Sequence, residues 1–386
     1  MDIEPSFRSS VLQNDMSNLC SSEQPLRAAI PYSNACLSND MLIQSEAMEP
    51  QQYLTVADIS QVAEARRLVT KLGARMGLDE TEKGRLAIVA TEIATNLIKH
   101  AEGGLLLLRA LGADQNDGIE ILAIDKGPGI VDLAQSIRDG YSTAGTPGGG
   151  LGAIYRLSKL FDLYSVPTGG TVLLSRASSR PSALEPFEIG VVCLPKPGEE
   201  VCGDSWDVAQ SQERSVFLVA DGLGHGPLAA EAGQEAIRIF RKNLNGNPAV
   251  IVEALHAGLR STRGAVLAVV EIDGVHDRVC MAGVGNISVT IQSPENNRRL
   301  VSLNGTVGRD VRKIREFASP WPEDGMLIMH SDGLETHWNL RKYPGLASRH
   351  PGVVAGTLYR DHCRGNDDIT ILVAARAPLP LHNGSR

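Results

Sequence analysis

The chain has 386 residues, enough for two or three domains of ordinary size. Its net charge is -8 and it shows no cluster of Lys and Arg, which argues against a nucleic-acid-binding surface. The sequence opens without a basic and apolar leader, its apolar runs are far shorter than the roughly 20 residues that span a bilayer, and its six cysteines form no CxxC pair. These features predict a cytoplasmic protein with free thiols and no membrane partner.

The first half of the chain reads as a tail followed by a compact α/β domain. Residues 1–50 are rich in Ser, Asn, Gln and Met without periodicity, which predicts a poorly ordered tail. A short strand is expected at Tyr53, and apolar residues then recur at helical spacing. The expected elements that follow are helices over 57–77 and 82–101, strands over 104–111 and 118–130, a helix over 152–161, and strands over 162–166 and 170–177.

The second half has a different pattern, dominated by strands. Residues 178–186 carry two prolines and three serines and read as a linker. Two helices are expected near 227–243 and 248–260, and residues 379–386 form a second tail. The expected strands cover 187–195, 214–222, 263–273, 277–292, 325–333 and 368–377. Many antiparallel strands with a few helices indicate a layered α+β domain over 187–378.

Polar residues share one face of the helix over 82–101. Glu92, Asn96 and His100 are spaced at i, i+4 and i+8 among apolar neighbours. Alone, this pattern also fits an ordinary solvated face. The following strand ends in Asp125, a position from which a carboxylate can accept a hydrogen bond from an exocyclic amine. Gly127 and Gly129 come next and allow the backbone to pass close to a flat ligand.

A glycine-rich stretch then runs directly into a helix. The sequence "DGYSTAGTPGGGLGAIYRLS" ends its glycine run at Gly150 and Gly152, where free backbone amides at a helix start attract phosphate. A linker is the alternative interpretation of such a run. Thr171 opens the last strand of the domain and supplies a fourth polar group. The four features, in this order, predict a nucleotide site closed by a phosphate lid.

The residues from about 53 to 177 resemble the GHKL superfamily of ATPases, and "DKGPGI" and "FDLYSVPTGGT" resemble its RsbT-type serine/threonine kinases. The resemblance implies an α/β sandwich that binds ATP with Mg²⁺. It implies that Asn96 holds the Mg²⁺, that Asp125 takes the adenine amino group with help from Thr171, and that Glu92 is the general base. It also implies that the lid over the phosphates is shaped by Gly127, Gly129, Gly150 and Gly152.

Isolated aspartates recur at strand ends in the second half. They occur in "CGDSWDV", "VADGLGHG", "HSDGL" and "GNDDITIL", usually beside glycine. Any one of them fits a turn, but the set fits carboxylates that converge at one end of a sheet sandwich. Oxygen ligands of this kind suit Mg²⁺ or Mn²⁺, and the chain lacks the Cys and His spacing of a zinc site.

Residues 186–376 resemble the metal-dependent protein phosphatases of the 2C type, in particular their SpoIIE-like and RsbX-like branch. The resemblance implies two Mn²⁺ or Mg²⁺ ions and a hydroxide that attacks phosphorus. It implies that Asp221 bridges the metals, that Asp332 and Asp367 complete the second metal's ligands, and that Asp204 acts mostly through water. It further assigns one metal contact to the carbonyl of Gly222.

Three points stay open within this resemblance. Leu223 stands where the eukaryotic branch has a histidine, and His225 comes two residues later, so no general acid is assigned. Asp368 is an alternative to Asp367 as ligand. The "GVGNIS" segment at Gly283 is interpreted as a turn that packs near the site.

The whole chain is therefore expected to be α+β: a GHKL-type α/β sandwich over 51–177, then a layered αββα phosphatase 2C-like domain. The families implied act on a STAS-domain antagonist or a stressosome-like protein. The resulting hypothesis is a bifunctional bacterial signalling protein that phosphorylates and dephosphorylates such a partner and so controls sigma-factor activity. The alternative is an ATP-binding anti-sigma factor that sequesters a sigma factor, with a regulatory phosphatase domain.

Overall fold

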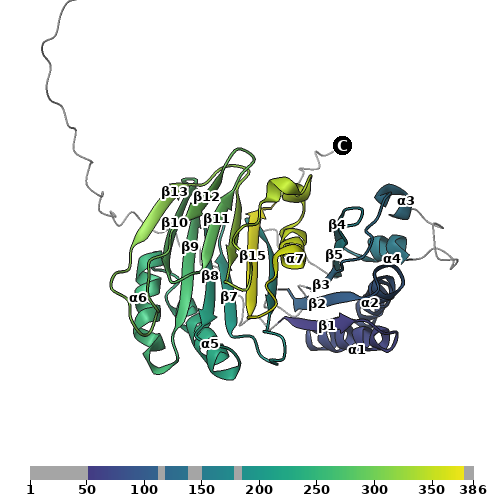
Figure 1. Cartoon of the computed structure of the whole chain (residues 1–386), viewed down its shortest axis with the longest axis horizontal. Helices are drawn as coiled ribbons and strands as arrows, with labels where there is room; N and C mark the ends of the chain where they lie inside the picture. The colour runs from purple at the N-terminus through teal and green to yellow at the C-terminus, as the bar shows by residue number, and fades with distance from the viewer. Residues whose placement is uncertain (1–50, 112–117, 138–149, 178–184, 378–386) are drawn as a thin grey trace, which may run out of the picture. The chain divides into compact units, whose positions relative to one another are not determined.

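The computed structural model describes residues 51–111, 118–137, 150–177 and 185–377 (Figure 1). The expected tails, the lid segment 139–149 and most of the expected linker lie outside these described residues. The described residues belong to one compact unit. Within them, none of the helices combines the length and apolar character that crossing a membrane requires.

The first part of the chain forms one antiparallel sheet with helices on one face. The strand order is β1-β2-β3-β5-β4. The sheet contains β1 (Gln52–Val56), β2 (Gly104–Ala110), β3 (Ile119–Ile124), β4 (Leu160–Ser165) and β5 (Thr171–Ala177). The helices are α1 (Ser60–Arg75), α2 (Glu80–Ala101), the short α3 (Leu133–Ile137) and α4 (Gly150–Leu157). Apolar side chains of α1, α2 and α4 pack on one face of the sheet, which confirms the two-layer sandwich.

Local contacts explain where these helices begin and end. Asp79 caps α2 by accepting a hydrogen bond from the Glu82 amide at 2.8 Å. The expected helix over 152–161 is wrong at its C-terminal end, since α4 stops at Leu157. There the Ser158 hydroxyl donates to the Ile154 carbonyl at 2.6 Å and lies 2.7 Å from the Ser175 hydroxyl of β5. These bonds turn the chain into β4.

The second part is a sandwich of two five-stranded antiparallel sheets, ordered β13-β10-β9-β8-β7 and β12-β11-β14-β15-β6. Apolar side chains fill the space between them, with Phe187 edge-to-face on Phe217 and Trp321. The strands are β6 (Phe187–Leu194), β7 (Asp204–Gln210), β8 (Arg214–Gly222), β9 (Ala265–Asp273), β10 (Arg278–Val284), β11 (Ser288–Gln292), β12 (Asn297–Leu300), β13 (Glu316–Pro320), β14 (Met326–His330) and β15 (Ile369–Arg376).

Helices cover both outer faces of this sandwich. The outer face of the first sheet packs against α5 (Pro227–Lys242) and α6 (Pro248–Gly258), with η1 (Leu259–Ser261) following α6. The outer face of the second sheet packs against α7 (Pro351–His362). Two further 3₁₀ turns, η2 (Leu340–Lys342) and η3 (Leu346–Ser348), lie between β14 and α7. The layers therefore follow the expected αββα order.

Several elements were not expected from the sequence. Helix α7 begins at Pro351, and His350 caps it by accepting from the Gly352 amide at 2.9 Å. The expected strand 277–292 is two strands, β10 and β11, because Gly285 at φ 99° turns the chain between them. Strands β7, β12 and β13 and helix α3 were also missed.

A row of charges, buried at Arg109 and Glu120 and half-buried at Arg176, crosses the first sheet. Arg109, Glu120 and Arg176 lie directly opposite one another on β2, β3 and β5. Glu120 is 1% exposed and accepts from Arg109 Nε at 3.0 Å and from Arg176 Nε at 2.9 Å. Burial alone would raise the pKa of Glu120, but the two guanidinium groups lower it to about 2.

We predict that Glu120→Gln lowers the free energy of unfolding in urea by about 3 kcal/mol, because the buried Arg109 and the half-buried Arg176 lose their shared counter-charge. The pKa of Glu120 is depressed in the folded state, so its contribution is present above pH 4.5 and is lost as the pH falls toward 2. The matched control is Glu253→Gln on the exposed face of α6. Equal, small losses in both variants at pH 7 would contradict the prediction.

Candidate functional site

The first constellation comes together at the start of α4. Glu92 and Asn96 point from α2 toward Gly150, the first residue of α4. A Cβ atom added to Gly150 would lie 3.5 Å from Asn96 Oδ1 and 4.0 Å from Glu92 Oε2. The helix N-terminus thus faces an amide and a carboxylate that are both half-buried. Lys99 and His100 are exposed at the end of α2.

Asp125 is held at the junction of β3 and β5. Its Oδ1 accepts from the Gly127 amide at 2.8 Å and from the Thr171 amide at 3.0 Å. Burial raises the pKa of Asp125, while these two hydrogen bonds oppose the rise. The Thr171 hydroxyl lies 2.9 Å from the Ser165 hydroxyl. The carboxylate of Asp125 is therefore fixed by backbone amides.

Close backbone approaches account for the glycines around Asp125. A Cβ at Gly127 would come within 2.7 Å of Ala101 in α2, and one at Gly129, where φ is 72°, within 2.2 Å of the Val166 carbonyl. Gly170 was missed from the sequence, yet a Cβ there would be 2.2 Å from the Asp125 carbonyl. Gly152 is buried within α4. These glycines let the segments around Asp125 cross without side chains between them.

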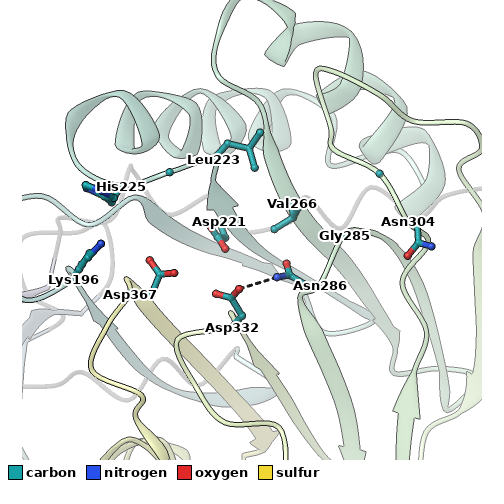
Figure 2. Close-up of a pocket in the computed structure, with 12 residues that line it drawn as sticks. Lys196, Asp221, Leu223, His225, Val266, Gly285, Asn286, Asn304, Asp332 and Asp367 are labelled. Atoms are coloured by element: carbon teal, nitrogen blue, oxygen red, sulfur yellow. Dashed lines mark hydrogen bonds between the residues drawn. The ribbon is translucent and has the colours of Figure 1, made fainter.

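The second constellation gathers at one end of the sheet sandwich (Figure 2). Asp221, near the end of β8, lies directly opposite Asp204 at the start of β7. Asp332 follows β14 and Asp367 precedes β15. A cavity of about 530 Å³ is lined by Asp221, Asp332 and Asp367 together. Gly222 follows Asp221 and packs against α5, where a Cβ would be 2.2 Å from the Ala229 carbonyl.

The structure separates the roles of Asp367 and Asp368. Asp368 is 3% exposed, and its two carboxylate oxygens accept from the Lys196 amide at 2.7 Å and the Gly203 amide at 3.1 Å. Asp367 lines the cavity instead. Asp368 therefore holds the loop that precedes Asp204, and Asp367 is the better placed of the two to bind a ligand.

The carboxylates in this cluster repel one another. Burial first, then the charges of Asp204, Asp332, Asp367 and Asp368, raise the pKa of Asp221 to about 9. Burial likewise raises the pKa of Asp204 to about 7. The Ser331 hydroxyl donates to Asp204 Oδ2 at 2.6 Å, but Asp204 Oδ1 is buried and has no hydrogen-bond partner. A buried oxygen without a partner amid like charges is an environment that a cation would stabilise.

The carboxylates of Asp221, Asp332 and Asp367 fit Mg²⁺ or Mn²⁺ by their chemistry, because they offer oxygen ligands around an open space. Among the residues in the described ranges, no three His, Cys, Asp or Glu side chains are grouped closely enough to coordinate one ion as they stand. The cluster thus has the charge and exposure of a divalent-cation site, with its side chains spread around the cavity wall.

The cavity also contains residues to which the sequence assigned no role. Asn286, in the expected turn near the site, donates from Nδ2 to Asp332 Oδ2 at 2.9 Å, so the position of that turn is confirmed. Lys196 and His225 line the same cavity, and His225 Nδ1 lies 2.6 Å from Glu199 Oε1. Nothing in the sequence around Ser331, which precedes Asp332 in "HSDG", indicated that its hydroxyl would bind Asp204. Lys196 and Asn286 are ordinary loop residues until the fold brings them together.

The two domains, each with its own cluster of polar residues, match two different family models. The family model described as "Histidine kinase-like ATPase domain" matches residues 55–176. The model described as "Stage II sporulation protein E (SpoIIE)" matches residues 211–377.

Two curated relatives match the two halves separately. The serine/threonine-protein kinase RsbT of Bacillus subtilis is 30% identical over 124 residues, covering 32% of this chain and 93% of RsbT. The phosphoserine phosphatase RsbX of the same organism is 25% identical over 142 residues, covering 36% of this chain and 71% of RsbX. The chain belongs to the RsbT family through its first half, and its second half is a SpoIIE-type phosphatase 2C domain.

Solved structures with similar folds include the phosphatase domain and part of the regulatory domain of SpoIIE from Bacillus subtilis. It is 18% identical with a TM-score of 0.45, and the match covers 83% of this chain and 96% of that chain. RsbX in complex with magnesium is 22% identical with a TM-score of 0.43, covering 50% of this chain and 96% of that one. The protein therefore combines a serine/threonine phosphatase domain with an RsbT-type kinase domain.

We predict that Asp221→Asn stabilises the metal-free protein, because Asn, unlike Asp, need not take up a proton to enter this cluster of carboxylates on folding. The pKa of Asp221 is raised to about 9 in the folded state, so its ionisation opposes folding increasingly as the pH rises from 4 toward 9. The gain in unfolding free energy should reach roughly 1 kcal/mol or more and grow between pH 5 and pH 8. Thermal unfolding in EDTA measures it, and a loss of stability at pH 8 would contradict it.

Proposed function

We propose that this protein adds and removes phosphate on serine or threonine residues of one partner, a STAS-domain antagonist or stressosome-like protein, and so controls sigma-factor activity in the cytoplasm. The observation that supports this most directly is the cavity lined by Asp221, Asp332 and Asp367 beside the unpartnered oxygen of Asp204. The opposing half offers Glu92 and Asn96 facing the helix start at Gly150.

In the kinase half, ATP with Mg²⁺ would supply the phosphoryl group. Asn96 would hold the Mg²⁺, and the amides at Gly150 and Gly152 would receive the phosphates. Asp125, fixed by the Thr171 amide, would accept the adenine amino group. Glu92 would accept the proton of the substrate hydroxyl. These groups mainly position the reactants, which is the main protein contribution to phosphoryl transfer.

In the phosphatase half, two Mn²⁺ or Mg²⁺ ions would supply an activated hydroxide and charge neutralisation when bound. Asp221, the Gly222 carbonyl, Asp332 and Asp367 would hold them. Asp204 is fixed through Oδ2 by the Ser331 hydroxyl, and its unpartnered Oδ1 would help to hold the ions indirectly.

The cavity wall supplies further groups for the phosphorylated side chain. Asn286 keeps Asp332 in place through its amide. Lys196 places a cation on the wall, where it would attract the phosphoryl oxygens of the substrate.

We predict that Asn96→Asp weakens the binding of ADP with Mg²⁺ by about 100-fold, since a new negative charge would face the phosphates. Gly150→Ala should also weaken it, because the added methyl fits the protein but takes space beside Asn96. Calorimetry measures both, with Gly84→Ala as matched control, since a Cβ there meets nothing within 4 Å. Unchanged affinity in both test variants would exclude this site.

The kinase and phosphatase activities can be tested together by incubating the protein with a purified STAS-domain partner, ATP, Mg²⁺ and Mn²⁺. We predict that Asp221→Asn lets phosphate accumulate on the partner, that the wild type leaves little, and that Glu92→Gln adds none. Mass spectrometry of the partner measures all three.

A sigma factor retained by the wild type with ATP, and no phosphate transferred by Asp221→Asn, would instead support the anti-sigma alternative.

A further inference from the structure

Helix α7 is buried on two sides. One side packs on β6 and β15 of the phosphatase sandwich, and the other packs on β3, β4 and β5 of the kinase-type sheet. Val353, Val354 and Leu358 of α7 belong to one apolar cluster with Leu122 and Ile124 of β3 and with strands of both domains. The two domains therefore share part of one core.

Two glycines let α7 approach the kinase-type sheet closely. A Cβ at Gly356 would lie 2.8 Å from Val172 Cγ1 and 3.5 Å from Ile124 Cδ1, and one at Gly352 would lie 2.9 Å from Leu174 Cδ1. On the opposite side, a Cβ at Gly190 of β6 would be 2.0 Å from the Gly352 amide. Since neither side has spare room, a shift of β3 and β5 must move α7 or be resisted by it.

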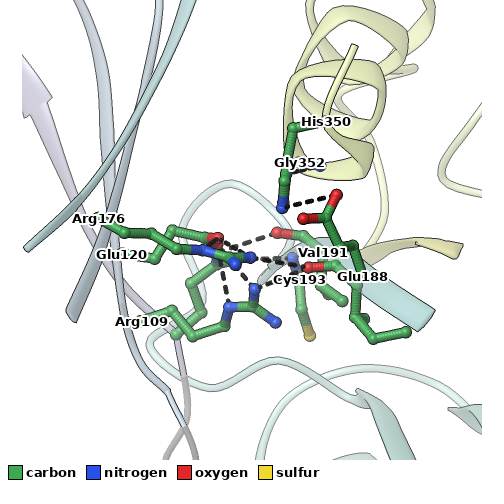
Figure 3. Close-up of polar contacts among 10 residues, drawn as sticks. Arg109, Glu120, Arg176, Glu188, Val191, Cys193, His350 and Gly352 are labelled. Atoms are coloured by element: carbon green, nitrogen blue, oxygen red, sulfur yellow. Dashed lines mark hydrogen bonds and ion pairs between the residues drawn. The ribbon is translucent and has the colours of Figure 1, made fainter. Parts of the chain in front are cut away.

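Polar contacts fix the same boundary (Figure 3). β6 is the last strand of its sheet, and kinase-domain side chains bond its backbone. Arg109 Nη2 donates to the Ile189 carbonyl at 3.1 Å, and the Gln51 side chain bonds the Val191 carbonyl at 3.1 Å and the Cys193 amide at 2.8 Å. Asp162 of β4 accepts from the His350 amide, just before α7, at 2.7 Å.

The two ends of the α7 contact lie close to the two candidate sites. On the kinase side, Gly356 contacts Ile124 and Val172, the sequence neighbours of Asp125 and Thr171.

On the phosphatase side, the chain leaving α7 is bonded to the segment after Asp332. The Arg364 amide donates to the Gly333 carbonyl at 2.9 Å, and the Glu335 amide donates to the His362 carbonyl at 3.0 Å. Asp367 comes five residues after His362, the last residue of α7.

We propose that α7 is a mechanical link through which nucleotide bound at Asp125 steadies the metal-binding loop of the phosphatase. A bound adenine would restrict the ends of β3 and β5, and the tightly packed α7 would carry this restriction to residues 363–367. By thermodynamic linkage, nucleotide would then strengthen the binding of divalent ions at the phosphatase loop, and these ions would strengthen the binding of nucleotide by the same factor. The proposal rests on the nucleotide site proposed above.

Hydrogen–deuterium exchange of the full chain at constant Mg²⁺, with and without ADP, tests the link. We expect amide exchange across residues 357–367 to slow by at least about 5-fold on addition of ADP, the lower end of typical coupling between sites. Gly356→Ala, which places a methyl 2.8 Å from Val172, should reduce this protection while ADP still binds. Gly84→Ala is the matched control and should keep it.

A second variant keeps the proposal testable if Gly356→Ala does not fold. Asp162→Asn weakens the contacts with the His350 amide and with Arg349 at the start of α7 and leaves the packed glycines untouched. It should reduce the protection partly. If calorimetry shows that ADP binds the wild type but exchange across 357–367 is unchanged, the link is wrong and the nucleotide site stands. If ADP does not bind, both proposals are wrong.

Discussion

The double burial of α7 is the constraint on which the arrangement of this chain depends. A helix normally buries one stripe and leaves the other in water, but α7 has buried residues all round, among them Gly352, Val353, Leu358 and Arg360. Its two sides are covered by the sheets of two different domains. The kinase-type sheet consequently has helices α1, α2 and α4 on one face and a phosphatase helix on the other.

Electrostatic repulsion among carboxylates is the second feature that distinguishes this structure. The phosphatase cavity places Asp221, Asp332 and Asp367 together and surrounds Asp221 with enough negative charge to raise its pKa to about 9. A protein tolerates such a cluster at a functional site because a ligand can relieve it. In the absence of such a ligand, the apolar core of the sandwich, in which Phe217 and its neighbours are buried, stabilises the fold that keeps the carboxylates together.

Much of the architecture could be predicted from the sequence, because strand and helix periodicity and the glycine–aspartate motifs are local signals. The positions of Asp125 and Asp221 at strand ends were predicted this way. Helix α7 was missed because "PGVVAGTLYRDH" has two glycines and no polar face, as its burial between two sheets requires. Asn286 and Lys196 could not be found, since only the folded sheets bring them to the cavity. The choice between Asp367 and Asp368 needed the hydrogen bonds of Asp368 to the Lys196 and Gly203 amides.

A crystal structure of the full chain with Mn²⁺ and ADP tests the central claim most directly. The account predicts anomalous Mn²⁺ density between Asp221, Asp332 and Asp367, and an adenine whose amino group contacts Asp125, in one and the same molecule. Manganese bound away from these carboxylates, or a nucleotide that leaves Asp125 and Asn96 untouched, would contradict it.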